Sequence, residues 1–187
     1  MPGATRRQRE QGFTLIELMI VVVILAILLA VAGPSFFDSL TRNQVRTQAS
    51  LVVSSLNLAR SKAVERNHPV SICTSTYSTA QANPICDGAL TLNDGWVIFL
   101  DAAEDGVSAA DEVVKAIEGL PDDFTIKNAV FPITFYPDGS ASTSTGANPM
   151  YFCPPDNDAQ KTWSVVLEAT GRPQMVGPDG NAANVCS

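Results

Sequence analysis

Four cysteines are the residues of this sequence whose types and spacing most clearly indicate chemistry: Cys73, Cys86, Cys153 and Cys186. No two of them form a C-x-x-C pair, and a zinc site needs closely spaced cysteine or histidine ligands. The spacing therefore favours disulfide bonds, which form in oxidising compartments. Four cysteines allow three pairings. We expect Cys73–Cys86 and Cys153–Cys186, because short loops close at a lower entropic cost.

The remaining reactive residues do not form a catalytic pattern. His68 is the single histidine, and nucleophilic catalysis needs a serine or cysteine placed beside a base. The sequence contains no G-x-S-x-G motif, no P-loop and no dinucleotide-binding fingerprint. We therefore predict that the protein is not an enzyme and uses no cofactor, and we interpret His68 as the residue that ends a helix.

A cluster of carboxylates could attract calcium, which prefers several oxygen ligands. Its spacing does not follow the EF-hand template. We interpret the segment as a solvated hairpin loop and predict no metal site, with calcium binding as the alternative. The carboxylates are Asp101, Glu104, Asp105, Asp111 and Glu112.

One further carboxylate, Glu17, lies in an otherwise apolar segment. Residues 18–32 are all apolar, and the 21 residues 13–33 would extend about 32 Å as an α-helix. A hydrocarbon core is roughly 30 Å thick, so this segment is long enough to cross it. An ionisable group there costs about 2.5–3.5 kcal/mol or more and usually has a partner. Arginines precede the segment and none directly follows it, which predicts a cytoplasmic start and an external head.

The position of the small residues excludes an ordinary secretory signal peptide. Such a peptide has its small-residue cleavage site after the apolar stretch. Here Gly12 lies before that stretch, and no A-x-A-like site follows it.

The stretch GFTLIEL at residues 12–18 resembles the processing motif of type IV pilins and type II secretion pseudopilins. The resemblance implies that a prepilin peptidase removes a leader, residues 1–12, by cutting after Gly12, and then methylates the new amine of Phe13. It also implies that Glu17 pairs with the N-terminal amine of a neighbouring subunit, which would neutralise a carboxylate in lipid. Pro34 matches the helix-kinking proline of this family, since a proline removes one backbone donor.

Beyond residue 33 the helical period continues. Apolar residues recur at alternating spacings of four and three, a pattern that buries one face of a helix. We therefore predict a transmembrane and filament-core helix over 13–33 and its amphipathic continuation over 34–68. The predicted stripe is Val45, Ala49, Val52, Leu56, Ala59 and Ala63.

Charge is divided unevenly along the 187 residues, whose net charge is −7. Residues 35–68 carry a net charge of +3, whereas residues 69–187 carry four Lys and Arg against fifteen Asp and Glu. So acidic a region repels nucleic acid unless its few cations cluster. We interpret the arginines of the helix as a solvated face, with a partner surface as the alternative. They are Arg42, Arg46, Arg60 and Arg66.

From residue 69 onward the pattern changes to short β-type runs separated by Pro, Gly, Asn and Asp. This predicts an α+β fold, in which the second half of the long helix packs on an antiparallel β-sheet head formed by residues 69–187. The expected strands are Val70–Cys73, Trp96–Leu100, Val113–Ile117, Ile133–Tyr136, Met150–Cys153, Trp163–Leu167 and Gln174–Val176.

The strand at 95–101, its acidic loop and the late Gly171-Arg172 resemble the GspH/FimT/FimU group of minor pilins and pseudopilins. The resemblance implies a FimU/FimT-like minor pilin. Such a subunit is held in the bacterial inner membrane with a periplasmic head, then enters a type IV pilus near its tip, where it starts assembly with other major and minor pilins.

Two alternatives remain open. One is a GspH-like pseudopilin of a type II secretion system. The other is a DNA-binding minor pilin, since some FimT-like proteins use a basic patch near the C-terminus. Lys161 and Arg172 are the candidate DNA contacts. Because a patch must supply several cations to phosphates, we do not expect nucleic acid to be a partner.

Overall fold

The computed structural model describes residues 13–76, 86–102, 113–121, 123–143, 145, 149–178 and 185–186, and for residues 30–35 it describes the helical backbone alone. The chain divides into two compact units, Met1–Leu40 and Thr41–Ser187, and each is considered by itself. The predicted leader, residues 1–12, lies outside the described residues.

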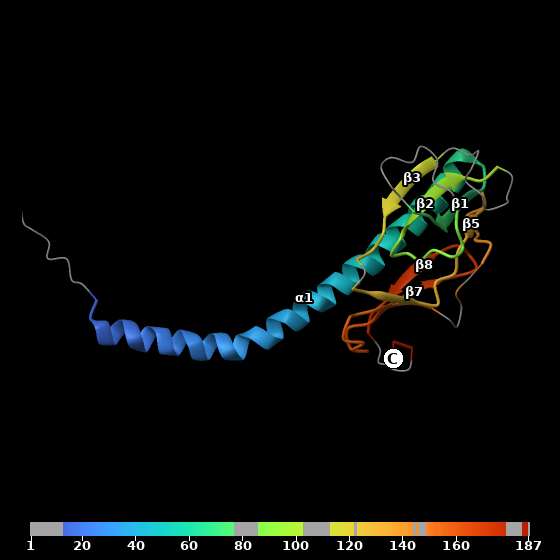
Figure 1. Cartoon of the computed structure of the whole chain (residues 1–187). Helices are drawn as coiled ribbons and strands as arrows, with labels where there is room; N and C mark the ends of the chain where they lie inside the picture. Colours follow the sequence, from blue (N-terminus) through green and yellow to red (C-terminus); the bar gives the residue numbers. More distant parts are fainter. Residues whose placement is uncertain are drawn as a thin grey trace, which may run out of the picture. The chain divides into compact units, whose positions relative to one another are not determined.

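One long helix, α1 (Leu15–Arg66), begins in the first unit and ends in the second (Figure 1). Thr14 is its N-cap, because the Thr14 Oγ1 accepts a hydrogen bond from the backbone N–H of Glu17 at 3.3 Å. At the other end Asn67 adopts a left-handed conformation with φ at 52°, and Pro69 follows. Both features end helices. The observed helix starts and ends within two residues of the predicted limits.

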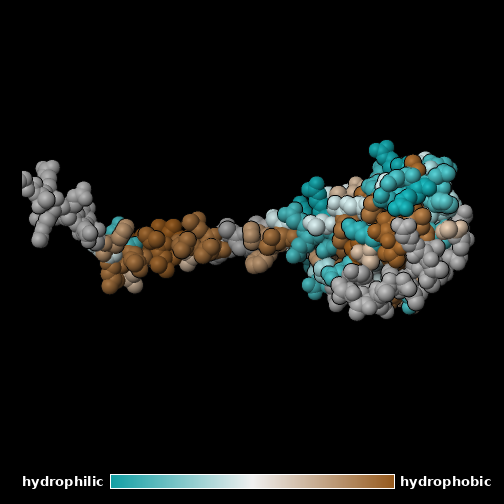
Figure 2. Space-filling model, turned by 90° about the horizontal axis from the view of Figure 1, so that it is seen from above, coloured by the Kyte–Doolittle hydropathy of each residue, from teal (hydrophilic) through white to brown (hydrophobic). Residues whose placement is uncertain are grey.

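The part of α1 in the first unit has an apolar surface. Between Leu15 and Leu29 its large apolar side chains are 52–78% exposed, and Figure 2 shows them as a brown surface around this part of the helix. Among the described residues there is no helix whose length and apolar character would let it cross a membrane.

In the second unit the predicted apolar stripe of α1 is confirmed. All six of its residues, from Val45 to Ala63, are completely buried and belong to one core cluster. The spacing of four and three residues therefore identified the face of the helix that carries the head.

The head contains two four-stranded sheets where one sheet was expected. Every strand pair is antiparallel, and the strand orders are β3-β2-β1-β5 and β4-β6-β7-β8. The α+β class is confirmed, and the single sheet is corrected to two. The strands are β1 (Val70–Thr74), β2 (Gly95–Leu100), β3 (Val113–Glu118), β4 (Thr125–Lys127), β5 (Ile133–Phe135), β6 (Met150–Cys153), β7 (Trp163–Leu167) and β8 (Pro173–Val176).

Strand β4 was not predicted, because three residues are too few to display a period of two. The chain then changes sheets twice. It leaves β4 in the second sheet, forms β5 beside β1 in the first, and returns to the second sheet at β6. The pattern of single strands contains no information on this exchange, because alternation reports which face of a strand is buried and not which strand lies beside it.

One apolar core joins α1 to both sheets. Trp96 of β2 and Phe135 of β5 contribute from the first sheet, and Phe152 of β6 and Leu167 of β7 contribute from the second; all four are at most 1% exposed. α1 contributes to the same core through residues such as Leu56, so both sheets pack against the helix.

Candidate functional site

The processing and assembly residues lie at the start of α1 where the structure describes them. Phe13 precedes the helix and is 82% exposed, and Glu17 is an exposed residue of the first turn. A carboxylate in the first turn interacts favourably with the helix dipole. Gly12 lies outside the described residues, and at Pro34 the structure describes a continuous helical backbone. Phe13 and Glu17 are thus exposed to contact with another chain.

All four cysteines form disulfide bonds, and none is free. Cys73 of β1 is joined to Cys86, and Cys153 at the end of β6 is joined to Cys186, with Cα–Cα distances of 5.6 Å in both bonds. This is the pairing that short loop closure favoured. Because the sulfurs are bonded to each other, these cysteines supply no thiolate to a metal or a substrate.

The two candidate DNA contacts do not form a pair of exposed cations. Lys161 is only 7% exposed, and its Nζ lies 2.6 Å from Asp156 Oδ2 and 3.5 Å from Asp158 Oδ2. The hydrogen bond from the Lys161 ammonium holds the pKa of the Asp156 carboxyl below its ordinary value. Arg172 is exposed, so of these two side chains only Arg172 presents its charge to solvent.

Two arginines of α1 contact the head, which corrects their interpretation as a purely solvated face. The guanidinium of Arg46 lies 5.5 Å from the ring centroid of Trp163 in β7, within the range of a cation–π interaction. Arg60 donates from Nε to the carbonyl oxygen of Gly139 at 2.9 Å. The sequence carries no signal for either contact, because Arg60 and Gly139 are 79 residues apart.

The buried end of β2 holds the one described carboxylate of the predicted acidic loop. Asp101 is completely buried, and its Oδ2 accepts a 2.6 Å hydrogen bond from the Ser71 hydroxyl. The Ser71 oxygen also lies 2.7 Å from the Thr134 hydroxyl oxygen. The network therefore joins the residue that follows β2 to Ser71 of β1 and Thr134 of β5. Residues 104, 105, 111 and 112 lie outside the described residues. Within the described part of the chain, no three His, Cys, Asp or Glu side chains are grouped to hold a metal ion.

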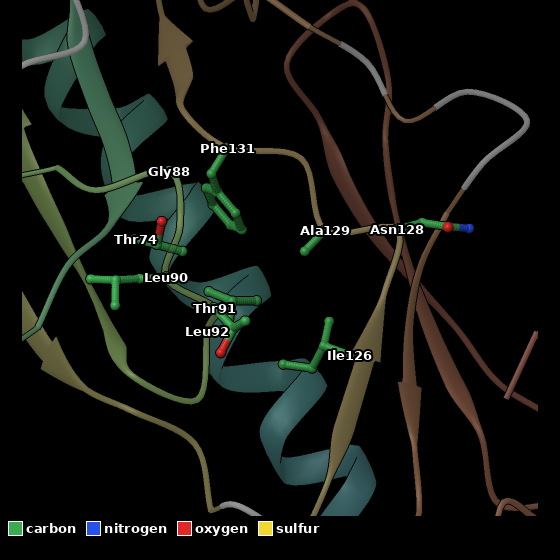
Figure 3. A pocket seen from close by; sticks show the side chains of 9 residues that line it. All are labelled: Thr74, Gly88, Leu90, Thr91, Leu92, Ile126, Asn128, Ala129 and Phe131. Carbon is green, nitrogen blue, oxygen red and sulfur yellow. The ribbon is translucent and has the colours of Figure 1, made fainter.

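Figure 3 shows a cavity of about 310 Å³ between the loop at 88–92 and the segment 126–131. Leu92, Ile126, Ala129 and Phe131 surround the open space, whereas the amide of Asn128 points away from it. The wall is of mixed polarity, because Thr74 and Thr91 also line it, and the described residues that form it include no Asp, Glu, His, Cys or Lys side chain. They therefore offer no group for acid–base catalysis and no base that would activate a nucleophile.

Comparison with known proteins gives relatives among pilus subunits. The chain is 51% identical over 55 residues to the "Fimbrial protein" of Pseudomonas aeruginosa, covering 29% of this chain and 35% of that protein. A second fimbrial protein of the same organism matches to the same extent. The chain therefore spans about a third of the length of the curated relatives that it matches.

Among solved structures, the chain matches the type IV minor pilin FimU of Pseudomonas aeruginosa, to which it is 18% identical. The similarity covers 71% of this chain and 93% of FimU, with a TM-score of 0.49. The minor pseudopilin EpsH of the Vibrio cholerae Type 2 Secretion System is 10% identical, with 73% of this chain and 98% of EpsH covered at the same TM-score.

Two family models match the chain along most of its length. The "Prokaryotic N-terminal methylation motif" matches residues 7–33, which implies processing by a prepilin peptidase. The model "Type II transport protein GspH" matches residues 48–171, which is about two thirds of the chain. The predicted resemblance is confirmed: the chain belongs to the GspH family of type IV pilin-like and pseudopilin subunits.

Proposed function

We propose that the chain is a structural minor pilin of the FimU/FimT kind that enters a type IV pilus at or near its tip and helps assembly begin. One observation carries the proposal: a folded head follows a helix whose apolar side chains from Leu15 to Leu29 are more than half exposed. So much apolar surface must be covered by lipid or by other subunits. The mechanism is association, and the protein is not an enzyme.

Processing and assembly follow from the start of the helix. The peptidase cuts after Gly12 and methylates the amine of Phe13. The helix over 13–33 holds the subunit in the inner membrane, with the head in the periplasm, where the two disulfides form. During assembly the apolar helix moves from lipid to protein contacts, Glu17 pairs with the N-terminal amine of a neighbour, and Pro34 adapts the helix to the filament core.

A second function is favoured by the description of the family itself. The GspH model describes a type II transport protein, and the same helix and head would serve a pseudopilin in a type II secretion filament. A DNA-binding role is less favoured, because Lys161 is buried against Asp156 and Asp158, which leaves Arg172 as the exposed cation of the predicted pair.

Deletion of the gene in its native host separates the two functions. We expect the number of surface pili to fall and to recover when the wild-type gene is restored, with secretion of type II substrates unchanged. A Phe13→Ser variant changes the residue that is methylated and leaves the head intact. It therefore tests the processing site separately from the head. Unchanged pili together with reduced secretion would contradict the minor pilin and favour the pseudopilin. Unchanged pili and secretion would contradict both.

A further inference from the structure

Arg42 and Arg46 form an exposed basic face on the part of α1 that belongs to the second unit. They are four residues apart, so their side chains lie on the same side of the helix. Arg46 is held in place by the Trp163 ring at 5.5 Å. A guanidinium fixed in this way loses less side-chain entropy when it binds an anion. Arg46 is therefore a preorganised cation for a carboxylate, with the exposed Arg42 beside it.

The end of the first sheet where β2 begins and β3 ends carries the opposite charge. Glu118 lies opposite Gly95 in the β2–β3 register, next to Asp94, and both carboxylates are on exposed residues. Asp123 is exposed on the loop that follows β3, and this loop is tied to the start of β2 by bonds from the Asn93 amide to the carbonyls of Pro121 and Phe124, at 2.9 and 3.0 Å.

The Asp94 carboxylate at this end is fixed as well as exposed. Asp94 Oδ2 accepts hydrogen bonds from the N–H and the hydroxyl of Thr91, at 2.8 and 3.0 Å, and these bonds hold the Asp94 pKa below its ordinary value. Lys115 lies further back along β3 and is paired in register with Ile98. The sheet end is thus anionic at neutral pH. The head as a whole is also acidic, since residues 69–187 contain fifteen Asp and Glu but four Lys and Arg.

We propose that the basic face of α1, Arg42 and Arg46, binds the acidic end of the first sheet, Asp94, Glu118 and Asp123, in the head of a second copy of this chain. The inference rests on the proposed function, since it names the neighbour of a filament subunit. Charge complementarity carries it: the helix segment 35–68 has a net charge of +3 and the head has a strong negative charge. Two copies must then lie side by side in the membrane or in the filament.

Photo-cross-linking of the full chain in its native host tests this contact. A benzophenone side chain replaces Ser50, which is exposed one turn beyond Arg46 on the same side of α1. Irradiation of intact cells is expected to give a homodimer whose cross-linked peptide, identified by mass spectrometry, comes from residues 94–123. A homodimer joined at any other segment, or no homodimer, overturns the proposal.

A charge exchange supplies the matched control. Arg42→Glu, which leaves the contact of Arg46 with Trp163 in place, and Glu118→Arg with Asp123→Arg are each expected to lower the homodimer yield about fivefold, as a rim ion pair replaced by repulsion would. Combining both changes restores more than half of the yield, which misfolding could not do. Asp138→Arg makes the same charge change as either carboxylate substitution alone, at an exposed residue beyond the end of β5, and leaves the yield unchanged. Failure of the combined variant to recover, or an equal loss in Asp138→Arg, overturns the proposal.

Two measurements on the same cells test this inference and the proposed function separately. An immunoblot of sheared filaments reports whether the chain enters a pilus, and the homodimer is measured independently in the membrane fraction. Filaments that contain the chain without the homodimer refute the contact and leave the minor pilin intact. A membrane homodimer joined at residues 94–123, without the chain in filaments, supports the contact and refutes the minor pilin.

Discussion

Replacing Gly171, in the turn before β8, by alanine should destabilise the head. The effect should exceed that of the same change at Gly177, which follows β8. Gly171 has φ at +74°, and a Cβ there would lie 2.1 Å from the carbonyl oxygen of Gly139. That oxygen accepts the 2.9 Å hydrogen bond from Arg60 of α1. The added methyl group therefore pushes on the turn at Gly139, through which the helix is attached to both β5 and the β7–β8 turn.

The magnitude follows from three effects at this position. A left-handed backbone costs a non-glycine residue about 1–2 kcal/mol, and overpacking costs about 1–3 kcal/mol. Weakening a hydrogen bond from a charged donor adds up to about 1.5–3 kcal/mol. Because these effects share the same atoms they do not add fully, and we expect a loss of about 3 kcal/mol. For a head of this size the loss corresponds to a decrease in Tm of about 6–12 °C.

Thermal unfolding followed by circular dichroism, on the processed chain in detergent, measures this decrease. Gly88→Ala is the matched control, since a Cβ at Gly88 meets nothing within 4 Å, and we expect its Tm within about 2 °C of the wild type. Arg60→Ala combined with Gly171→Ala should cost less than the sum of the two single changes, because both act through the oxygen of Gly139. A Gly171→Ala protein that melts with the wild type would refute this reasoning.

Two further predictions concern the second sheet. Lys161→Met should lower stability by about 1 kcal/mol at neutral pH, a value discounted for the half-exposed Asp156. Because Asp156 has a lowered pKa when folded, the ion pair contributes above the unfolded pKa of about 3.9 and is lost as pH falls through the folded pKa; a Tm difference that does not narrow below about pH 4 would contradict this. Removing the Cys153–Cys186 bond, which closes 33 residues, should cost more unfolding free energy than removing Cys73–Cys86, which closes 13. The difference in loop entropy is about 0.8 kcal/mol, and urea unfolding of the two variants measures it. The reverse order would show that loop length does not determine their contributions.

Much of the fold was accessible from the sequence because it depends on local periodicity. The stripe from Val45 to Ala63 identified the buried face of α1, and seven of the eight strands were expected close to their observed positions. The partition into two sheets was not accessible, because β5 pairs with β1 while its neighbours in sequence, β4 and β6, pair with each other. Such pairing is decided by long-range packing and not by the pattern of one strand.

The candidate site shows the same division. The contact of Arg60 with Gly139 spans 79 residues and leaves no local trace. The ion pairs of Lys161 were predictable in principle, since Asp156 and Asp158 precede it by five and three residues in a segment of turns, whereas its burial was not. The choice of Lys161 as a candidate DNA contact overlooked these two carboxylates.

If the chain enters a filament from the membrane as proposed, the balance of energies at Glu17 predicts what a neighbouring subunit would supply. A carboxylate in a membrane-spanning helix costs about 2.5–3.5 kcal/mol or more, whereas the helix dipole at the first turn returns about 0.3–1 kcal/mol. Under the proposed function, the remaining stabilisation would come from the N-terminal amine of a neighbouring chain. A Glu17→Gln variant removes the charge and keeps the shape. We expect it to accumulate in the membrane at the wild-type level, because insertion no longer includes a charge, and to fall at least about tenfold in sheared filaments, since a lost charge pair in low dielectric exceeds 1.4 kcal/mol. Equal incorporation of Glu17→Gln and wild type, measured by immunoblot of both fractions, would show that no neighbouring amine pairs with Glu17.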